Sequence, residues 1–234
     1  NIFSNKNELV HFDKKDFIFD IKIIKDILAI GISPLLLNSA LCVIVILINN
    51  GLKKFGGDLS VGAYGIVNRV TFFFTMIVMG ITQGMQPIVS YNYGARQYER
   101  VTEALKKAIL LAIATLSFGC LIGETTPKFV CSLFTNDEEL LNYSVEGMRI
   151  VMATFPIIAL PIVIGNFFQS IGKAKKSIVL SLSRQVLFLI PLLIILPNFI
   201  GIKGVWWSIP ISDVIATLLS IVMIYRYYKF DVKS

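Results

Sequence analysis

The chain has 234 residues and a net charge of +7; 55% of its residues are apolar and only 16% are charged, against about 25% in a typical soluble domain. The apolar residues lie in long blocks, which argues against a soluble domain, a disordered chain or a coiled coil. Three cysteines and one histidine are too few for a disulfide-stapled module or a His- or Cys-based metal site. The blocks predict an integral membrane protein, whose basic excess belongs to cytoplasmic loops rather than to a nucleic-acid interface.

The first segment, residues 1–26, is polar and carries charges of both signs. Apolar and charged residues alternate from Phe17 to Ile27, which is typical of an interfacial helix that leads into a membrane. The chain begins with Asn1 and shows no signal-peptide pattern, so we expect a fragment, or one half, of a longer protein.

Six apolar segments follow, and each is long enough to cross a bilayer as a helix. A span needs about 20 residues, because a helix rises about 1.5 Å per residue across about 30 Å of hydrocarbon. Strands of a membrane barrel would be shorter and would alternate in polarity, so we predict an all-α bundle of six transmembrane helices over residues 27–230. The predicted spans are 27–48, 62–88, 104–122, 143–171, 177–197 and 204–225, followed by a tail at 231–234.

The basic residues predict on which side of the membrane each loop lies. Of the 22 Lys and Arg residues, 15 lie in the N-terminal arm, in the loops after the second and fourth spans, and in the tail, whereas 4 lie in the opposite loops. The positive-inside rule therefore places both ends of the chain in the cytoplasm.

The second predicted span is the richest in polar residues, which are costly in a bilayer and are therefore functional candidates. Gly80, Gly84 and Pro87 loosen its cytoplasmic end. Two interpretations stay open, since the amides here either fasten a helix end and a turn or belong to a hinge that moves during transport. The candidate hinge and cytoplasmic motif comprises Gln83, Gln86, Pro87, Asn92 and Gly94.

The outer loop before the fourth predicted span carries two local signals. Thr135 and Glu138 have the spacing of a capping box, which predicts Thr135 as the N-cap of a helix. Glu146 and Arg149 are three residues apart, so we predict that they pair on one helix face.

Arg184 and Asp213 are the only charges deep inside the last two predicted spans. These spans are consecutive and antiparallel, so they should be neighbours. Counted from Lys176 and Arg226, the two charges lie about 12 Å and about 20 Å from the cytoplasmic face. The difference in depth, about 8 Å, is within reach of an arginine side chain if the helices tilt. We predict an ion pair or a water-bridged contact, which either fixes the helix register or takes part in moving protons or substrate.

Amides and soft apolar side chains on kinked spans are candidates for lining a substrate cavity. For the phenylalanines at 72–74 the alternative is lipid contact or helix packing. The chain has no hydrolase, metalloprotease or nucleotide-binding motif, so we do not expect an enzyme. The candidate cavity residues are Asn38, Asn68, Phe72, Thr75, Met76, Asn166 and Gln169.

Several ordered motifs together resemble the MATE family of multidrug and toxic compound extrusion transporters, and the pattern is most similar to the DinF-like and MepA-like bacterial branches. Each motif is weak alone, but together they extend over most of the chain. They are Ala63–Arg69, Gly84–Ile88, Tyr91–Ala95, Phe168–Lys173, Ser183–Gln185 with Pro191, and Pro210–Asp213.

The resemblance implies that the chain is the C-terminal six-helix half of a twelve-helix antiporter in a bacterial inner membrane, with residues 1–26 as the connector. Members of this family export amphipathic, often cationic, compounds in exchange for Na⁺ or H⁺ by alternating access. The implied partners are the lipid bilayer, an N-terminal six-helix half and small amphipathic substrates, with no nucleic acid.

The sequence departs from one branch of the family, which has cation-binding acids in the first and fourth helices of this half. No Asp or Glu occurs between Asp26 and Asp58 or between Glu146 and Asp213. We therefore expect no cofactor in this chain and expect the coupling ion, Na⁺ or H⁺, to bind in the missing N-terminal half. Two rival functions remain, a lipid-linked oligosaccharide flippase, which a basic cavity would favour, and a membrane assembly subunit without transport.

Overall fold

The computed structural model describes residues 21–231, so most of the predicted connector at 1–26 and the tail at 232–234 lie outside the described residues. The chain divides into two units, residues 1–38 and 39–234. In the first unit the described residues, 21–38, form the start of helix α1. Every contact discussed below lies within the second unit.

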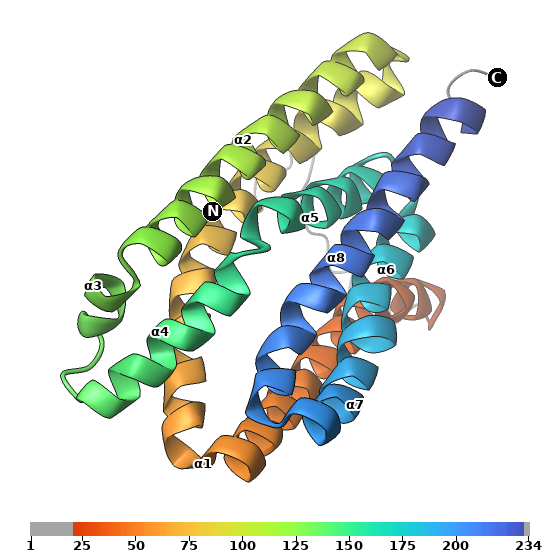
Figure 1. Cartoon of the computed structure of the whole chain (residues 1–234). Coiled ribbons are helices and arrows are strands. Elements are labelled where there is room, and N and C mark those ends of the chain that lie inside the picture. The colour runs from red at the N-terminus through yellow and green to blue at the C-terminus, as the bar shows by residue number, and fades with distance from the viewer. Residues whose placement is uncertain (1–20, 232–234) are drawn as a thin grey trace, which may run out of the picture. The chain divides into compact units, whose positions relative to one another are not determined.

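Most residues of the described part of the chain are helical, and this part contains no strand. Two π-helical segments, Ser183–Leu189 (η3) and Tyr227–Asp231 (η4), lie among the α-helices. The α-helices (Figure 1) are α1 Ile21–Gly94, α2 Tyr98–Thr125, α3 Pro127–Ser132, α4 Glu138–Met152, α5 Phe155–Ser170, α6 Ala174–Leu182, α7 Ile190–Ile200 and α8 Ile202–Arg226.

Helix α1 is broken at Gly57, where the backbone has φ 73° and ψ −172°. Glycine adopts such a conformation without a steric penalty, and the chain reverses direction there (Figure 1). Residues 39–56 and 58–94 therefore form two arms. These arms contain residues 39–48 of the first predicted span and the whole of the second, and the second arm continues to Gly94.

Within the described residues, four helical segments are long and apolar enough to cross a membrane, and α4 with α5 makes a fifth as a pair bent by 51°. One of the four is Ser39–Gly94, whose 56 residues include the break. An unbroken helix of that length would rise about 84 Å, far more than a bilayer requires. Counting its two arms separately gives the six crossings expected from the sequence.

The fourth predicted span, 143–171, consists of two helices rather than one. Helix α4 ends at Met152, and Pro156 lies in the first turn of α5. Proline has no N–H group to donate to the carbonyl one turn earlier, so it ends the preceding helix and begins the next one without loss. The break therefore falls just before Pro156, the first of two prolines in this span; the second is Pro161.

Two local predictions at the outer end of α4 are wrong. The N-cap is Asp137, whose Oδ1 accepts hydrogen bonds from the N–H groups of Glu139 at 2.9 Å and Leu140 at 3.1 Å. Thr135 Oγ1 instead accepts from the Asp137 N–H at 3.2 Å. Glu146 Oε1 lies 3.8 Å from Nζ of Lys203, at the start of α8, and the ion pairs of the described residues do not join Glu146 to Arg149. The basic partner of Glu146 therefore comes from a neighbouring helix.

Helix α5 lies at the centre of the second unit and packs against α2, α6 and α8. Figure 1 shows it between α2 and α8. Its Phe167 and Phe168 are fully buried, and their rings both contact Tyr227 in η4 edge-on. Burial of such large apolar side chains stabilises helix contacts by close packing, since lipid provides little hydrophobic drive between helices.

The thiol of Cys131 in α3 is fully buried, and burial raises its pKa to about 11. A raised pKa means that the neutral thiol persists until the pH approaches that value, and only the thiolate reacts readily. In a variant that keeps Cys131 as its only cysteine, we expect maleimide labelling at pH 7.5 to be at least about tenfold slower than in the denatured protein. Equal rates in the folded and denatured protein would contradict the buried position.

Candidate functional site: an intramembrane ion pair and a polar helix face

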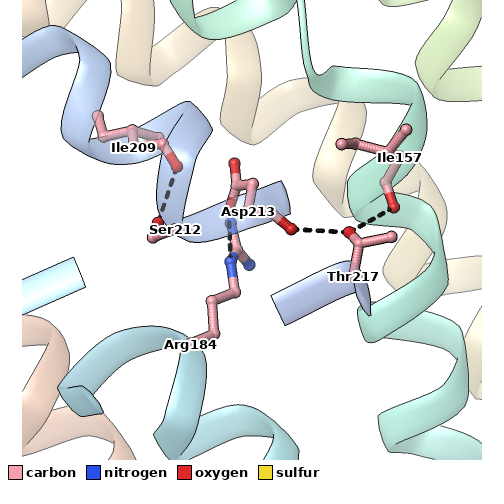
Figure 2. Close-up of polar contacts among 6 residues, drawn as sticks. All are labelled: Ile157, Arg184, Ile209, Ser212, Asp213 and Thr217. Carbon is pink, nitrogen blue, oxygen red and sulfur yellow. Dashed lines mark hydrogen bonds and ion pairs between the residues drawn. The ribbon is translucent and has the colours of Figure 1, made fainter. Parts of the chain in front are cut away.

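The ion pair joins η3 to α8. Arg184 Nε lies 2.7 Å from Asp213 Oδ1 (Figure 2). Asp213 is only 3% exposed, whereas about a third of the Arg184 side chain is accessible. The structure thus brings together the two charges whose depths were counted from the sequence, and the contact is direct.

A hydroxyl one turn after Asp213 ties the pair to a third helix. Thr217 Oγ1 lies 2.7 Å from the Asp213 carbonyl and 3.2 Å from the Ile157 carbonyl of α5 (Figure 2). Ile157 lies four residues before Pro161 in α5, and proline has no N–H group to donate to the Ile157 carbonyl. We did not select Thr217 from the sequence, although its position four residues after an intramembrane acid places it on the same helix face.

Arg184 is part of a π-helical segment, Ser183–Leu189. Such segments are rare, and they change the direction in which the following side chains point. In the same segment the Oε1 atom of Gln185 is buried and has no hydrogen-bond partner among the described residues. This part of the fifth span therefore has a π-helical backbone, and beside the residue of the ion pair it has one buried side-chain oxygen without a hydrogen-bond partner among the described residues.

A second polar junction joins α1 to α5. Gln86 Nε2 donates a hydrogen bond to Asn166 Oδ1 at 2.9 Å, and Ser90 Oγ donates to the Ser170 carbonyl at 2.8 Å. Asn166 also donates from Nδ2 to the Ile162 carbonyl one turn earlier. The structure therefore places one candidate hinge residue, Gln86, in contact with one candidate cavity residue, Asn166.

We expect the Gln86–Asn166 contact to contribute about 0.6 kcal/mol, the average of interhelical hydrogen bonds in membrane proteins. A double-mutant cycle of Gln86→Ala and Asn166→Ala should show this coupling in the free energy of unfolding. Gln169→Ala is the control partner, because Gln169 is exposed on the same helix. Strict additivity of the Gln86 and Asn166 variants would contradict a direct hydrogen bond.

The remaining hinge candidates occupy different positions. Asn92 is buried and donates from Nδ2 to the Ile88 carbonyl at 2.7 Å, while its backbone carbonyl accepts from the Gln97 N–H at 2.9 Å. Gly94 is the last residue of α1. The Asn92 side chain thus bonds within its own helix, and its Oδ1 is buried without a partner among the described residues, whereas Gln83 and Pro87 are exposed.

The candidate cavity residues on α1 lie on an exposed face. Asn68, Phe72 and Met76 are exposed and Thr75 is partly buried. Phe72 lies four residues after Asn68 and three or four before Thr75 and Met76, as on one side of a helix. Gln83 and Arg69 belong to the same side. Within the described residues these side chains line an open face, not an enclosed pocket. The Asn38 side chain lies outside the described residues.

The exposed surface of this arm has a second, apolar side. Phe73, Ile77 and Ile88 are large, exposed and apolar, and their spacing places them next to the polar side on the same helix. The exposed surface of α1 therefore has an apolar strip suited to lipid and a second strip, called here the polar strip, in which Asn68, Arg69 and Gln83 stand among Phe72, Met76 and Met79.

The chain is similar to known transporters over most of its length. Multidrug export protein MepA of Staphylococcus haemolyticus (strain JCSC1435) is 23% identical over 224 residues, which are 95% of this chain and 49% of that protein. A solved structure of the MATE multidrug transporter DinF-BH, determined as a complex, is 38% identical with a TM-score of 0.79, over 94% of this chain and 49% of that one. A structure of MATE in complex with MaL6 is 20% identical and has the same fold, with a TM-score of 0.84 over 100% of this chain and 53% of that one.

The chain spans about half the length of the relatives that it matches. The names of these relatives describe transporters rather than enzymes. A family model described as MatE matches residues 30–195, which is most of the chain. The chain therefore belongs to the MatE family of multidrug efflux transporters.

Proposed function

We propose that this chain forms the C-terminal half of a cation-coupled antiporter that exports amphipathic, often cationic, compounds by alternating access. The observation that carries the proposal is the polar strip of α1, which includes Asn68, Thr75 and Gln83. Polar side chains are costly against lipid, so the strip favours contact with a water-filled path or with another six-helix bundle. Relatives about twice as long as this chain support the second bundle as its partner.

The coupling ion, Na⁺ or H⁺, is proposed to bind in that other half. In the membrane segments described here, Asp213 is the one acid deep in a span, and Arg184 already pairs with it. A guanidinium group next to a carboxylate disfavours a second cation there. We therefore propose that an unpaired intramembrane acid elsewhere in the protein binds the coupling ion.

The first test is the coding sequence upstream of Asn1. We expect it to encode about 200 further residues with six more apolar segments, because a second six-helix bundle has about that length. The second test is efflux of ethidium from proteoliposomes that contain the full-length protein, driven by an imposed Na⁺ or H⁺ gradient. Gradient-dependent efflux would support the antiporter, whereas a stable protein with no flux would favour the assembly subunit.

A further inference from the structure

Arg69 is a cation inside a membrane span that forms no ion pair with another described residue. It is the only charged residue between Gly62 and Ile88, and its side chain is exposed. The ion pairs of the described residues do not include it, whereas Arg184 is held by Asp213 at 2.7 Å. Arg69 lies seven residues after Gly62, about 10 Å from the outer end of the predicted span. An arginine side chain that faces lipid there is costly unless it reaches water or an anion.

The position of Arg69 on α1 identifies the face concerned. Phe72 and Met76 follow it by one and two turns on the polar strip, and Asn68 precedes it directly. A Cβ atom at Gly65 or Gly80, at either end of this stretch, would have nothing within 4 Å, so the second unit leaves the space beside the strip open. Arg69 thus stands in an open region lined by an amide, an aromatic ring and a flexible thioether.

The charged residues of the described spans leave a net positive charge in the open region around Arg69. The charge of Asp213 is compensated by Arg184, and the other ion pairs between described residues lie towards helix ends or breaks, for example Lys53 with Asp58. Arg69 is then the uncompensated charge along the described polar strip. A guanidinium group binds a carboxylate through two parallel hydrogen bonds, while rings and thioethers accept varied apolar bodies.

Given the proposed transport function, on which this inference rests, we propose that Arg69, with Asn68 and Phe72, binds the carboxylate of amphipathic acids and zwitterions on the transport path. This half therefore selects for an anionic group, in addition to the cationic compounds expected of the whole transporter. Arg69 and Asn68 provide polar groups, and Phe72 and Met76 beside them provide apolar surface. A small amphipathic ligand would use both kinds of surface, whereas a single acidic side chain of another helix would use only the polar one.

The test compares two dyes that differ only in the carboxylate. Rhodamine 110 has a free carboxylate, and rhodamine 123 is its methyl ester. Binding of each to the full-length protein in nanodiscs is measured by fluorescence polarisation. We expect Arg69→Gln to raise the Kd of the acid about tenfold, which corresponds to about 1.4 kcal/mol, and to change the Kd of the ester less than about twofold. Arg69→Lys should recover part of the loss.

Arg100→Gln is the matched control, because it removes one exposed positive charge near the N-terminal end of α2, away from the polar strip, and should alter neither Kd. An unchanged Kd of the acid in Arg69→Gln overturns the proposal. Equal weakening of both dyes together with a lower Tm also overturns it and indicates that Arg69 pairs with a carboxylate of the protein. Efflux of the ester by the wild type is measured separately, so that a failure of the transport proposal is distinguished from a failure of carboxylate binding.

Discussion

Replacing Arg184 with glutamine is expected to destabilise the protein by about 3 kcal/mol. The substitution leaves the Asp213 carboxylate, which is 3% exposed, without its partner. A buried charge that loses its counter-charge typically costs about 3–5 kcal/mol, and protonation of the carboxyl group limits the loss. Asp213→Asn should be destabilising for the complementary reason. Thermal unfolding in detergent micelles measures both.

The double variant Arg184→Met/Asp213→Leu separates stability from function. Apolar residues of similar size can replace a buried ion pair with little loss, so we expect the double variant to unfold near the wild-type temperature. If the pair only fixes helix register, the double variant also keeps efflux; recovered stability with lost efflux would assign the pair a part in transport. Single variants as stable as the wild type would contradict the structural importance of the pair.

The exposed pair of Lys53 and Asp58 is the control for the ion-pair variants. Their side chains are 70% and 87% accessible, and the atoms are 3.4 Å apart. Pairs of this kind contribute little because water already solvates both charges. Lys53→Gln should therefore leave the unfolding temperature essentially unchanged.

The six-span architecture and the ion pair could be predicted because both depend on position along single helices. Apolar block length sets the number of crossings, and depth along two antiparallel helices put Arg184 within side-chain reach of Asp213. The contact between Gln86 and Asn166 could not be predicted in this way, since 80 residues separate them. Helical spacing indicates which residues share a face but not which neighbouring helix lies against it.

The local errors have a similar cause. Thr135 has the spacing of an N-cap, but Asp137 takes the role because its carboxylate reaches two backbone N–H groups. Glu146 was assigned to the nearest basic residue on its own helix, whereas Lys203 comes from the start of α8. In both cases a competing residue was present in the sequence. The local turn before α4 decides the first case, and the packing of α8 against α4 decides the second.

Replacing Gly204 with alanine is the second substitution from which we expect a large effect. A Cβ atom there would lie 2.5 Å from the carbonyl carbon of Leu196 and 2.6 Å from the nitrogen of Pro197. These are backbone atoms that no change of rotamer can move, so α7 and α8 would have to separate. Overpacking of this kind costs about 1–3 kcal/mol, and we expect the upper end of that range.

The comparison with Gly65→Ala tests whether crowding is the cause. A Cβ atom at Gly65 meets nothing within 4 Å, so this substitution should be neutral or slightly stabilising through better helix propensity. An unchanged Tm in Gly204→Ala would show that the two helices do not approach this closely.

Gly204 and Asp213 lie on α8, while Leu196 follows Arg184 along the preceding span. Separation of α7 from α8 should therefore also lengthen the ion pair, and the loss of stability in Gly204→Ala should be smaller when Arg184 and Asp213 have already been replaced by apolar residues.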